Sequence, residues 1–164
     1  MNTQDKIITP INGVYDDQQI AKHINKLARP IVFTNGCFDI LHRGHISYLE
    51  QARNLGGSLI VAANTDASVK RQNKGTDRPI NPLEDRLAIL ASLACVDLVL
   101  SFDDETPLKL IKTILPDHLV KGGDWLVKDI VGGEEVIANG GHVHSLEFEY
   151  QRSTTALLTK IRNL

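Results

Sequence analysis

Five short strand-like runs divide the chain, and their character limits the folds that it can adopt. The clearest run, "SLIVAAN" at 58–64, is apolar without the alternation of a strand that has one wet face. A strand of that kind has to be covered on both faces, as parallel strands in α/β proteins are. The other runs lie at 30–35, 96–102, 117–123 and 142–148.

Between these runs, apolar residues recur at helical spacing. The segment 81–94, "NPLEDRLAILASLA", also has a helix start, because Asn81 can cap, Pro82 fits the first helical position and Glu84 stands three residues after the cap. Further helices are predicted at 16–28, 46–57, 106–115, 132–141 and 153–164. The alternation predicts an α/β protein, a Rossmann-like five-stranded parallel sheet with helices on both faces.

The length of the chain limits the number of domains, and its charge limits the kinds of partner that it can bind. A chain of 164 residues has room for one domain, in which 1–28 forms a leader and a docking helix and 29–164 forms the main unit. A net charge of -2 and a pI near 6.3 give no basic field for nucleic acid. We therefore expect no nucleic-acid partner.

The compartment is predicted from the same composition. No apolar run approaches the roughly 20 residues that cross a bilayer, and the first residues lack the basic-then-apolar order of a signal peptide. The two cysteines, Cys37 and Cys95, each fall in a predicted core segment, so a disulfide framework is not expected. We expect a cytoplasmic protein without a membrane partner.

In such sheets the ligand crevice lies beyond the carboxyl ends of the strands, near the point where the strand order reverses. Four stretches follow predicted strands and are expected to face that crevice. They are 35–45, 64–78, 121–125 and the segment before Ser153.

The first of these stretches, "TNGCFDILHRGHISYLEQA" at 34–52, places His42 and His45 around Gly44 where a strand gives way to a helix. The free N–H groups and the positive dipole end of that helix form a ready anion site. Gly44 lets a phosphate or the neighbouring backbone approach without a Cβ in the way. Two imidazoles three residues apart can donate hydrogen bonds to one phosphoryl group.

The residues of this turn also admit other interpretations. His42 and His45 can be a helix cap and a surface histidine. With Cys37 and Asp39 they offer zinc ligands, although the usual paired-cysteine spacing is absent. Asp39 can orient a histidine or the turn, help to place Mg²⁺, or simply cap the turn.

The whole run "TNGCFDILHRGHISYLEQAR" resembles the nucleotidyltransferase superfamily of the cytidylyltransferase type, which has a His-x-Gly-His turn after a Gly-x-Phe-Asp strand end. Further blocks, among them "RPINPLEDRLAILASLACVD", "LVKGGDW", "ANGGHVHSLEFE" and "STTALLTKI", resemble heptose 1-phosphate adenylyltransferases, the adenylyltransferase half of ADP-heptose synthases. The resemblance covers about residues 20 to 164.

This resemblance implies a reaction in lipopolysaccharide inner-core precursor biosynthesis. ATP, with Mg²⁺ as cofactor, would react with D-glycero-β-D-manno-heptose 1-phosphate to give ADP-heptose and pyrophosphate. It also implies a homodimer and, because 164 residues cannot hold the sugar kinase of the bifunctional relatives, a separate heptose kinase. The alternatives are an enzyme like glycerol-3-phosphate cytidylyltransferase and a catalytically inactive nucleotide-binding regulatory module.

The resemblance assigns catalytic roles to His42, His45 and Lys74, and no protein ligand to a metal. Which of Lys70, Arg71 and Lys74 contacts phosphate stays open. Residues expected to bind the nucleotide are Asn35, Gly36, Cys37, Phe38, Gly44, Arg86, Lys121, Gly123, Asp124, Trp125, Ser153, Thr154 and Thr155.

Several of these residues have a structural alternative. Arg86 can pair with Glu84 or Asp85 at the surface instead of binding phosphate, and Trp125 can be a core residue at the rim instead of a sugar or base contact. Asp124 can accept a hydrogen bond from a ribose hydroxyl. Ser153 can cap the last helix, whose end can also bind triphosphate oxygens together with Thr154 and Thr155. Arg152 adds either a phosphate ligand or a surface charge.

Overall fold

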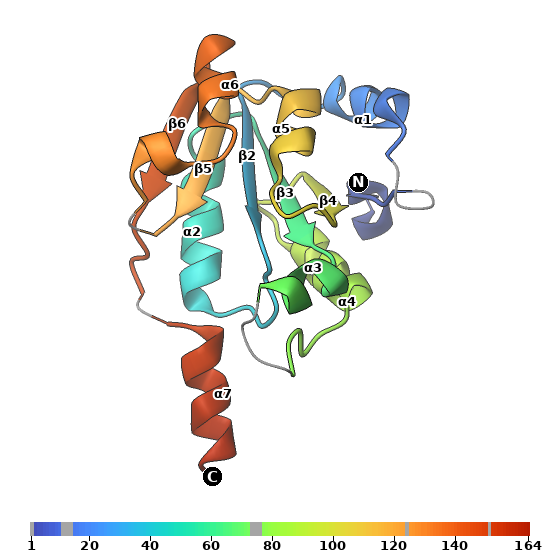
Figure 1. The fold of residues 1–164 in the computed structure, drawn as a ribbon. Helices are drawn as coiled ribbons and strands as arrows, with labels where there is room; N and C mark the ends of the chain where they lie inside the picture. The colour runs from blue at the N-terminus through green and yellow to red at the C-terminus, as the bar shows by residue number, and fades with distance from the viewer. Residues whose placement is uncertain (1, 11–14, 73–76, 124, 151) are drawn as a thin grey trace.

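The computed structural model describes residues 2–10, 15–72, 77–123, 125–150 and 152–164. Its described strands form one parallel sheet of six strands in the order β1-β4-β3-β2-β5-β6 (Figure 1). The strands are β1 (Ile7–Ile8), β2 (Ile31–Gly36), β3 (Ser58–Asn64), β4 (Leu98–Phe102), β5 (His118–Gly122) and β6 (His142–Leu146). The predicted α/β class and parallel sheet are confirmed.

The predicted number of five strands is wrong, because β1 is a sixth. It pairs with the edge of the sheet, with Ile7 opposite Val99 and Ile8 opposite Leu100. Two residues inside a polar leader are too short to show a periodic pattern. Ile8 is nevertheless 1% exposed, so tertiary burial makes this strand.

Helices cover both faces of the sheet, as predicted (Figure 1). Side chains of α1, α5 and α6 join one buried cluster, and side chains of α2 and α4 join the cluster on the opposite face. The helices are α1 (Asp17–Ile24), α2 (Arg43–Arg53), α3 (Asp66–Arg71), α4 (Leu83–Ser92), α5 (Leu108–Ile114), α6 (Gly133–Ala138) and α7 (Thr154–Arg162), with 3₁₀ turns η1 (Thr3–Lys6) and η2 (Val127–Asp129).

The start of α4 differs from the prediction. Pro82 is the N-cap residue, and Asn81 does not cap the helix. The Asn81 backbone N–H donates to Asp39 Oδ1 at 2.9 Å, and its side-chain amide donates to the Asp39 carbonyl at 2.6 Å. The local pattern assigns the Asn81 side chain to the helix end. In the structure it is hydrogen-bonded to Asp39, which is distant in the sequence.

The strand order reverses between β2 and β5. The chain runs from β2 to β3 and β4 on one side, and later adds β5 and β6 on the other side of β2. The carboxyl ends of β2 and β5 therefore stand beside each other at the place where α/β sheets bind ligands. The last helix, α7, begins near the first turn of α2 and extends away from the body of the molecule (Figure 1).

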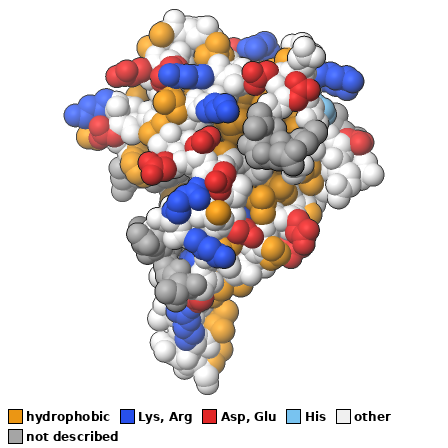
Figure 2. All heavy atoms as spheres, turned by 45° about the vertical axis from the view of Figure 1, so that its right-hand side comes forward, with side chains coloured by type: hydrophobic (Ala, Val, Ile, Leu, Met, Phe, Trp, Pro, Cys, Tyr) orange, Lys and Arg blue, Asp and Glu red, His pale blue; other side chains and the backbone are white. Residues whose placement is uncertain are grey.

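The surface carries charges of both signs. On the face in Figure 2, Lys and Arg alternate with Asp and Glu, without a field of one sign. Among the helices that the structure describes, none combines the length and apolar character needed to cross a bilayer.

The docking helix is joined to the core by a tyrosine. Ile20 and Ile24 of α1 are buried. The Tyr15 hydroxyl just before α1 donates to the Ser101 carbonyl at 2.5 Å and accepts from the Ser101 N–H at 2.7 Å. This hydroxyl therefore occupies both backbone groups of one residue of β4.

We expect Tyr15→Phe to lower the free energy of unfolding by about 1–3 kcal/mol, because it leaves both backbone groups of Ser101 without this partner. Urea denaturation measures the change. The control is Tyr150→Phe, which removes a hydroxyl near the surface that accepts from Arg43 and should cost less than about 0.5 kcal/mol. Equal losses for the two variants would contradict a special role for Tyr15.

Candidate active site

The histidine turn stacks its two imidazoles at the start of α2. The ring centroids of His42 and His45 are 3.8 Å apart with an interplanar angle of 19°. The ring of Phe38 meets His45 edge-on at 5.5 Å. His42 occupies the N-cap position, but its side chain makes no capping hydrogen bond. Helix capping therefore does not explain the His42 imidazole.

Burial favours the neutral form of both imidazoles. Partial burial lowers the pKa of His42, and burial followed by the charge of His42 lowers the pKa of His45 to about 4. Both Nδ1 atoms are buried, and neither finds a hydrogen-bond partner among the residues that the structure describes. Without ligand the rings are neutral at pH 7, and a nearby anion would favour protonation.

Gly44 is required by the chain that crosses above it. A Cβ at Gly44 would lie 2.8 Å from the Tyr150 carbonyl oxygen and 3.1 Å from His42 Nδ1. The strap that leads to α7 therefore passes directly against the first turn of α2. Gly44 was predicted to allow the close approach of either a phosphate or neighbouring backbone. The structure shows the approach of backbone.

A hollow opens beside the two rings, and we call it the histidine hollow. Two helix N-termini meet there, since His45 belongs to the first turn of α2 and Thr154 and Thr155 belong to the first turn of α7. The positive ends of two helix dipoles favour a bound anion. The lining residues are Cys37, Phe38, Asp39, His42, His45, Arg78, Phe148, Arg152, Ser153, Thr154 and Thr155.

The end of α7 has the predicted cap. Ser153 Oγ accepts from the Ala156 N–H at 3.0 Å, so capping by Ser153 is confirmed. The Thr154 hydroxyl donates to the Ile40 carbonyl at 3.3 Å and fastens this helix end to the histidine turn. Thr155 and Arg152 are exposed at the hollow.

Asp39 is a buried clamp. Its side chain is fully buried and forms a close ion pair with Arg78, whose side chain is also buried. The carboxylate further accepts from the backbone N–H groups of Ile80 and Asn81 at 2.8 and 2.9 Å. Of the alternatives for Asp39, the structure shows a residue that holds the turn. Its oxygens are already occupied and do not fit a role as a Mg²⁺ ligand.

Among the described residues no group of three or more His, Cys, Asp or Glu side chains is placed to hold a metal ion. The Cys37 thiol instead donates to Gln72 Oε1 at 3.2 Å. Neither Cys37 nor Cys95 forms a disulfide. The zinc interpretation therefore has no support in this geometry.

Arg86 lies behind the site, and this corrects both predictions made for it. It is 1% exposed, because it stands on the buried face of α4. Its guanidinium donates to the Cys37 carbonyl at 2.6 Å, the Asn81 carbonyl at 3.1 Å and Asp66 Oδ1 at 2.7 Å. It therefore supports the turn at Phe38, where φ is +47°, and neither contacts the histidine hollow nor pairs with its acidic neighbours on α4.

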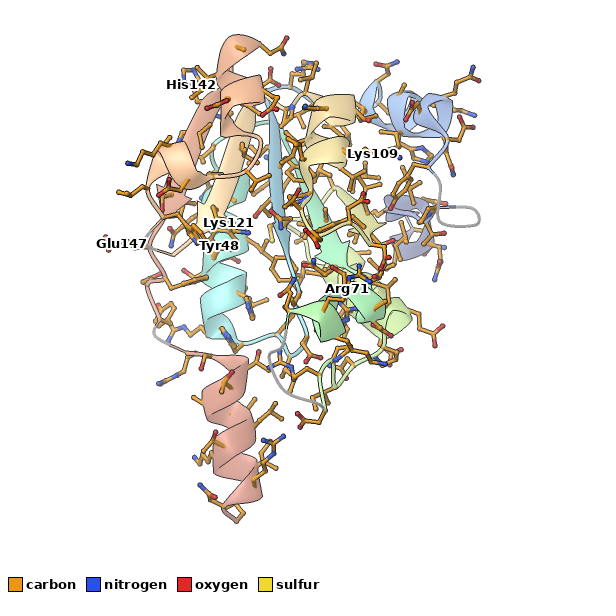
Figure 3. All side chains as sticks on the ribbon, viewed as in Figure 1. Tyr48, Arg71, Lys109, Lys121, His142 and Glu147 are labelled. Carbon is orange, nitrogen blue, oxygen red and sulfur yellow. The ribbon has the colours of Figure 1, made fainter. Side chains whose placement is uncertain are left out.

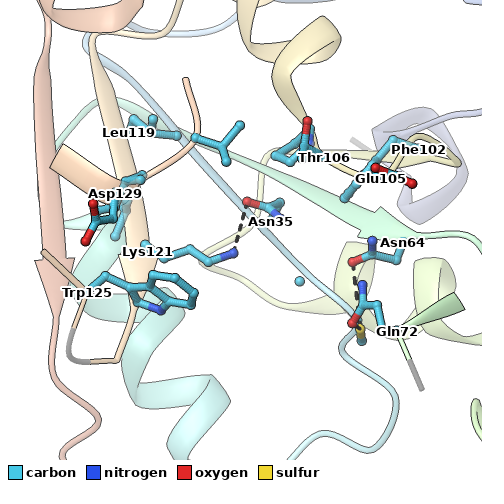
Figure 4. Close-up of a pocket in the computed structure, with 16 residues that line it drawn as sticks. Asn35, Asn64, Gln72, Phe102, Glu105, Thr106, Leu119, Lys121, Trp125 and Asp129 are labelled. Atoms are coloured by element: carbon cyan, nitrogen blue, oxygen red, sulfur yellow. Dashed lines mark hydrogen bonds between the residues drawn. The ribbon is translucent and has the colours of Figure 1, made fainter. Parts of the chain in front are cut away.

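A second hollow, the strand-end hollow, opens at the reversal of strand order (Figure 4). Lys121 Nζ donates to Asn35 Oδ1 at 3.5 Å and lies 5.9 Å from the ring centroid of Trp125. Cys37 lines both hollows, so the two adjoin there. The lining residues are Asn35, Gly36, Cys37, Asn64, Gln72, Phe102, Glu105, Thr106, Pro107, Leu119, Val120, Lys121, Trp125, Asp129, Ile130 and Val131.

The predicted nucleotide residues are thus divided between two hollows. The strand-end hollow takes Asn35, Gly36, Lys121 and Trp125, and the histidine hollow takes Phe38, Ser153, Thr154 and Thr155 with the two histidines. Trp125 is 50% exposed and is not a core residue. Gly123 has φ +106° and forms the turn from which Trp125 projects. Lys74 and Asp124 lie outside the described residues.

The described part of the basic stretch does not reach either hollow. Arg71 pairs with Asp103 at 3.2 Å, and Figure 3 shows it on α3, away from Lys121. Lys70 is exposed, and neither residue lines a hollow. The choice of Lys74 as the phosphate contact stays a prediction.

Sequence reasoning missed several lining residues of the strand-end hollow. Glu105 and Thr106 follow β4 closely. The stretches expected to face the crevice were chosen because they follow strands, and the same criterion would have included these two residues. Asn64 and Gln72 fall within a stretch expected to face the crevice but received no role. Asp129 comes from η2, for which the sequence has no signal.

The family model described as "Cytidylyltransferase-like" matches residues 33–157, from β2 into α7. The chain belongs to the cytidylyltransferase-like family. This match contains both hollows, since it includes every described residue that lines them.

Two named relatives share more than half of their aligned residues with this chain. The D-beta-D-heptose 1-phosphate adenylyltransferase of Bordetella bronchiseptica is 54% identical over 137 residues, which are 84% of this chain and 85% of that protein. The Bifunctional protein HldE of Psychromonas ingrahamii is 54% identical over 155 residues, which are 92% of this chain and 32% of that protein. The chain thus spans about a third of this bifunctional relative.

Solved structures agree with the fold. The lipopolysaccharide core biosynthesis protein from Thermoplasma volcanium has a TM-score of 0.58 at 29% identity, and the match covers 74% of this chain and 98% of that one. The pantoate-beta-alanine ligase from Francisella tularensis has a TM-score of 0.60 at 18% identity, covering 96% and 72%. The second likeness supports the fold alone.

We expect His45 of the free protein to titrate near pH 4 and His42→Ala to raise the pKa of His45, because this substitution removes a neighbouring positive charge. NMR titration of the imidazole signals measures both values.

The same shift predicts how stability depends on pH. His45 in the unfolded chain, with an ordinary pKa of 6.5, binds its proton at a higher pH than in the folded protein, so the free energy of unfolding should fall as pH drops from 6.5 towards 4 and level off below. A His45 midpoint at 6.5 would contradict the burial argument.

Proposed function

We propose that this protein joins ATP and D-glycero-β-D-manno-heptose 1-phosphate to give ADP-heptose and pyrophosphate, for the inner core of lipopolysaccharide. The observation that carries the proposal is the stacked pair His42 and His45 at two convergent helix N-termini. The identity of 54% to a heptose 1-phosphate adenylyltransferase along 85% of its length supports the choice of substrates.

The proposed chemistry is nucleotidyl transfer. An oxygen of the sugar 1-phosphate attacks the α-phosphorus of ATP and forms a new P–O bond. The bond from the α-phosphorus to the oxygen that bridges to the β-phosphorus breaks, and pyrophosphate leaves with the electron pair. Negative charge grows on the α-phosphoryl oxygens and on the leaving oxygen, so the protein has to position the reactants and stabilise that charge.

The histidine hollow supplies suitable groups for this task. His42 and His45 would donate hydrogen bonds to the α- and β-phosphates, and the negative phosphates would raise the pKa of both rings and strengthen the bonds. The N-terminus of α7 with Ser153 and Thr155 would hold oxygens of the triphosphate, as would Arg152 at the rim. Direct transfer from ATP to the sugar phosphate needs no nucleophile from the protein.

Mg²⁺ would enter as part of the ATP substrate. The carboxylate in the histidine hollow, Asp39, is already occupied by Arg78, Ile80 and Asn81. Mg²⁺ is commonly held by substrate phosphates with few protein ligands. Mg²⁺ bound in this way would not need Asp39 as a ligand. The bound ion would offset charge on the triphosphate.

The wider setting follows from the same proposal. The heptose 1-phosphate has to be supplied by a kinase, and we infer a separate heptose kinase. We also infer a homodimer and a cytoplasmic location, where ATP is available.

The substrate assignment is tested by pyrophosphate release with each pairing of ATP or CTP with heptose 1-phosphate or glycerol 3-phosphate. We expect turnover with ATP and heptose 1-phosphate. Turnover confined to CTP and glycerol 3-phosphate would select the cytidylyltransferase alternative. Nucleotide binding without release from any pair would select the inactive regulatory module.

The mechanism is tested by His42→Ala and His45→Ala. Each should lower kcat about 10²–10³-fold, because each removes a donor to the charge of the transition state. Thermal unfolding checks that the variants stay folded. His142→Ala is the matched control, since His142 is exposed on β6 and lines neither hollow. Undiminished turnover in either active-site variant would reject the assigned mechanism.

A further inference from the structure

We infer that the strand-end hollow binds the sugar of the acceptor, with its 1-phosphate at Lys121 and its hydroxyl groups read by Glu105 and Asp129. This inference rests on the proposed function and deepens it. It gives the hollow to the acceptor and leaves the triphosphate to the histidine hollow.

The two hollows differ in charge. The described lining of the strand-end hollow carries the carboxylates of Glu105 and Asp129 against one cationic side chain, Lys121. Such a surface repels a triphosphate, whose charge is several times that of one lysine. In the histidine hollow, Arg152 and two helix N-termini remain once Asp39 has paired with Arg78. The triphosphate therefore belongs with the histidines.

The groups of the strand-end hollow match a polyhydroxylated ligand. Sugar hydroxyls both donate and accept hydrogen bonds, and the hollow offers amides and a hydroxyl that do the same. Neither the Glu105 nor the Asp129 carboxylate has a hydrogen-bond or ion-pair partner within the described part of the chain, and both side chains are exposed. The remaining polar lining comes from Asn35, Asn64, Gln72 and Thr106.

The hollow also has an apolar side for a sugar ring. Half of the Trp125 surface is exposed, and an aromatic face of this kind packs against the C–H face of a sugar. Leu119, Ile130 and Val131 add aliphatic lining. Figure 4 shows Asp129 and Glu105 on opposite sides of the hollow, with Asn35 between them.

The position of Lys121 orients the acceptor. Its ammonium group reaches towards Asn35 at the carboxyl end of β2, next to Cys37, which lines both hollows (Figure 4). A phosphate held at Lys121 would therefore face the histidine hollow, and the rest of the sugar would extend towards the two carboxylates. Transfer in line needs the acceptor and the leaving pyrophosphate on opposite sides of the α-phosphorus. An acceptor in the strand-end hollow would approach the α-phosphorus from the side opposite the pyrophosphate in the histidine hollow.

The test is to measure KM for heptose 1-phosphate and for ATP separately in Glu105→Ala and Asp129→Ala. Each variant should raise KM for heptose 1-phosphate about tenfold and change KM for ATP by less than about twofold, because each removes a charged hydrogen-bond partner of the sugar. Both side chains are exposed, and thermal unfolding checks the fold. The matched control is Glu134→Ala, which removes an exposed carboxylate of α6 outside both hollows.

Two kinetic outcomes would overturn the inference. An increase in KM for ATP with that for heptose 1-phosphate unchanged would assign the hollow to the nucleoside. Unchanged KM values for both substrates would remove the hollow from substrate binding.

Failure of the proposed function is a different result, namely no pyrophosphate release from the unmodified protein. In that case calorimetric titration with heptose 1-phosphate alone decides the inference. Binding that weakens in Asp129→Ala but not in Glu134→Ala supports the sugar site. Absence of binding, or equal binding by both variants, rejects it.

Discussion

The ion pair between Asp39 and Arg78 is the contact on which the site depends. Taking two charges out of water is unfavourable, and a buried pair is tolerated only when further hydrogen bonds satisfy it. Here the backbone N–H groups of Ile80 and Asn81 complete the partners of the carboxylate. The pair thereby fastens the chain ahead of α4 to the turn between β2 and α2. The histidines and the end of α7 are arranged around that junction.

A second buried arginine completes the support. Arg86 holds the Cys37 carbonyl, next to a Phe38 backbone in the left-handed region that a bulky residue rarely adopts. All three guanidinium nitrogens of Arg86 and both carboxylate oxygens of Asp39 already have partners within the protein. Their contribution is to fix the backbone from which Cys37 reaches both hollows. Pre-organisation of this kind lets imidazoles and helix ends meet a growing charge without rearrangement.

The parallel sheet explains why two hollows of different charge adjoin. Its strand order reverses between β2 and β5, so the connections on either side of that point diverge and leave space at the strand ends. The β2 connection leads to the histidine turn, and the β5 connection leads to Trp125 and Asp129. The proposed transfer between two phosphorylated substrates would use two adjoining compartments of this kind.

Local chemistry in the sequence determined the five long strands, the helices on both faces and the use of Ser153 as a cap, because hydrophobic pattern and capping act over a few residues. The turn at His42 and His45, at the start of α2, was predictable for the same reason. Tertiary structure alone decided the edge strand at Ile7, the diversion of Asn81 to Asp39 and the burial of Arg86. Tertiary structure also decided which of the predicted site residues line each hollow. It placed Glu105 and Asp129 in the lining of the strand-end hollow. Each of these depends on contacts between distant segments, which the energetics of a short stretch do not contain.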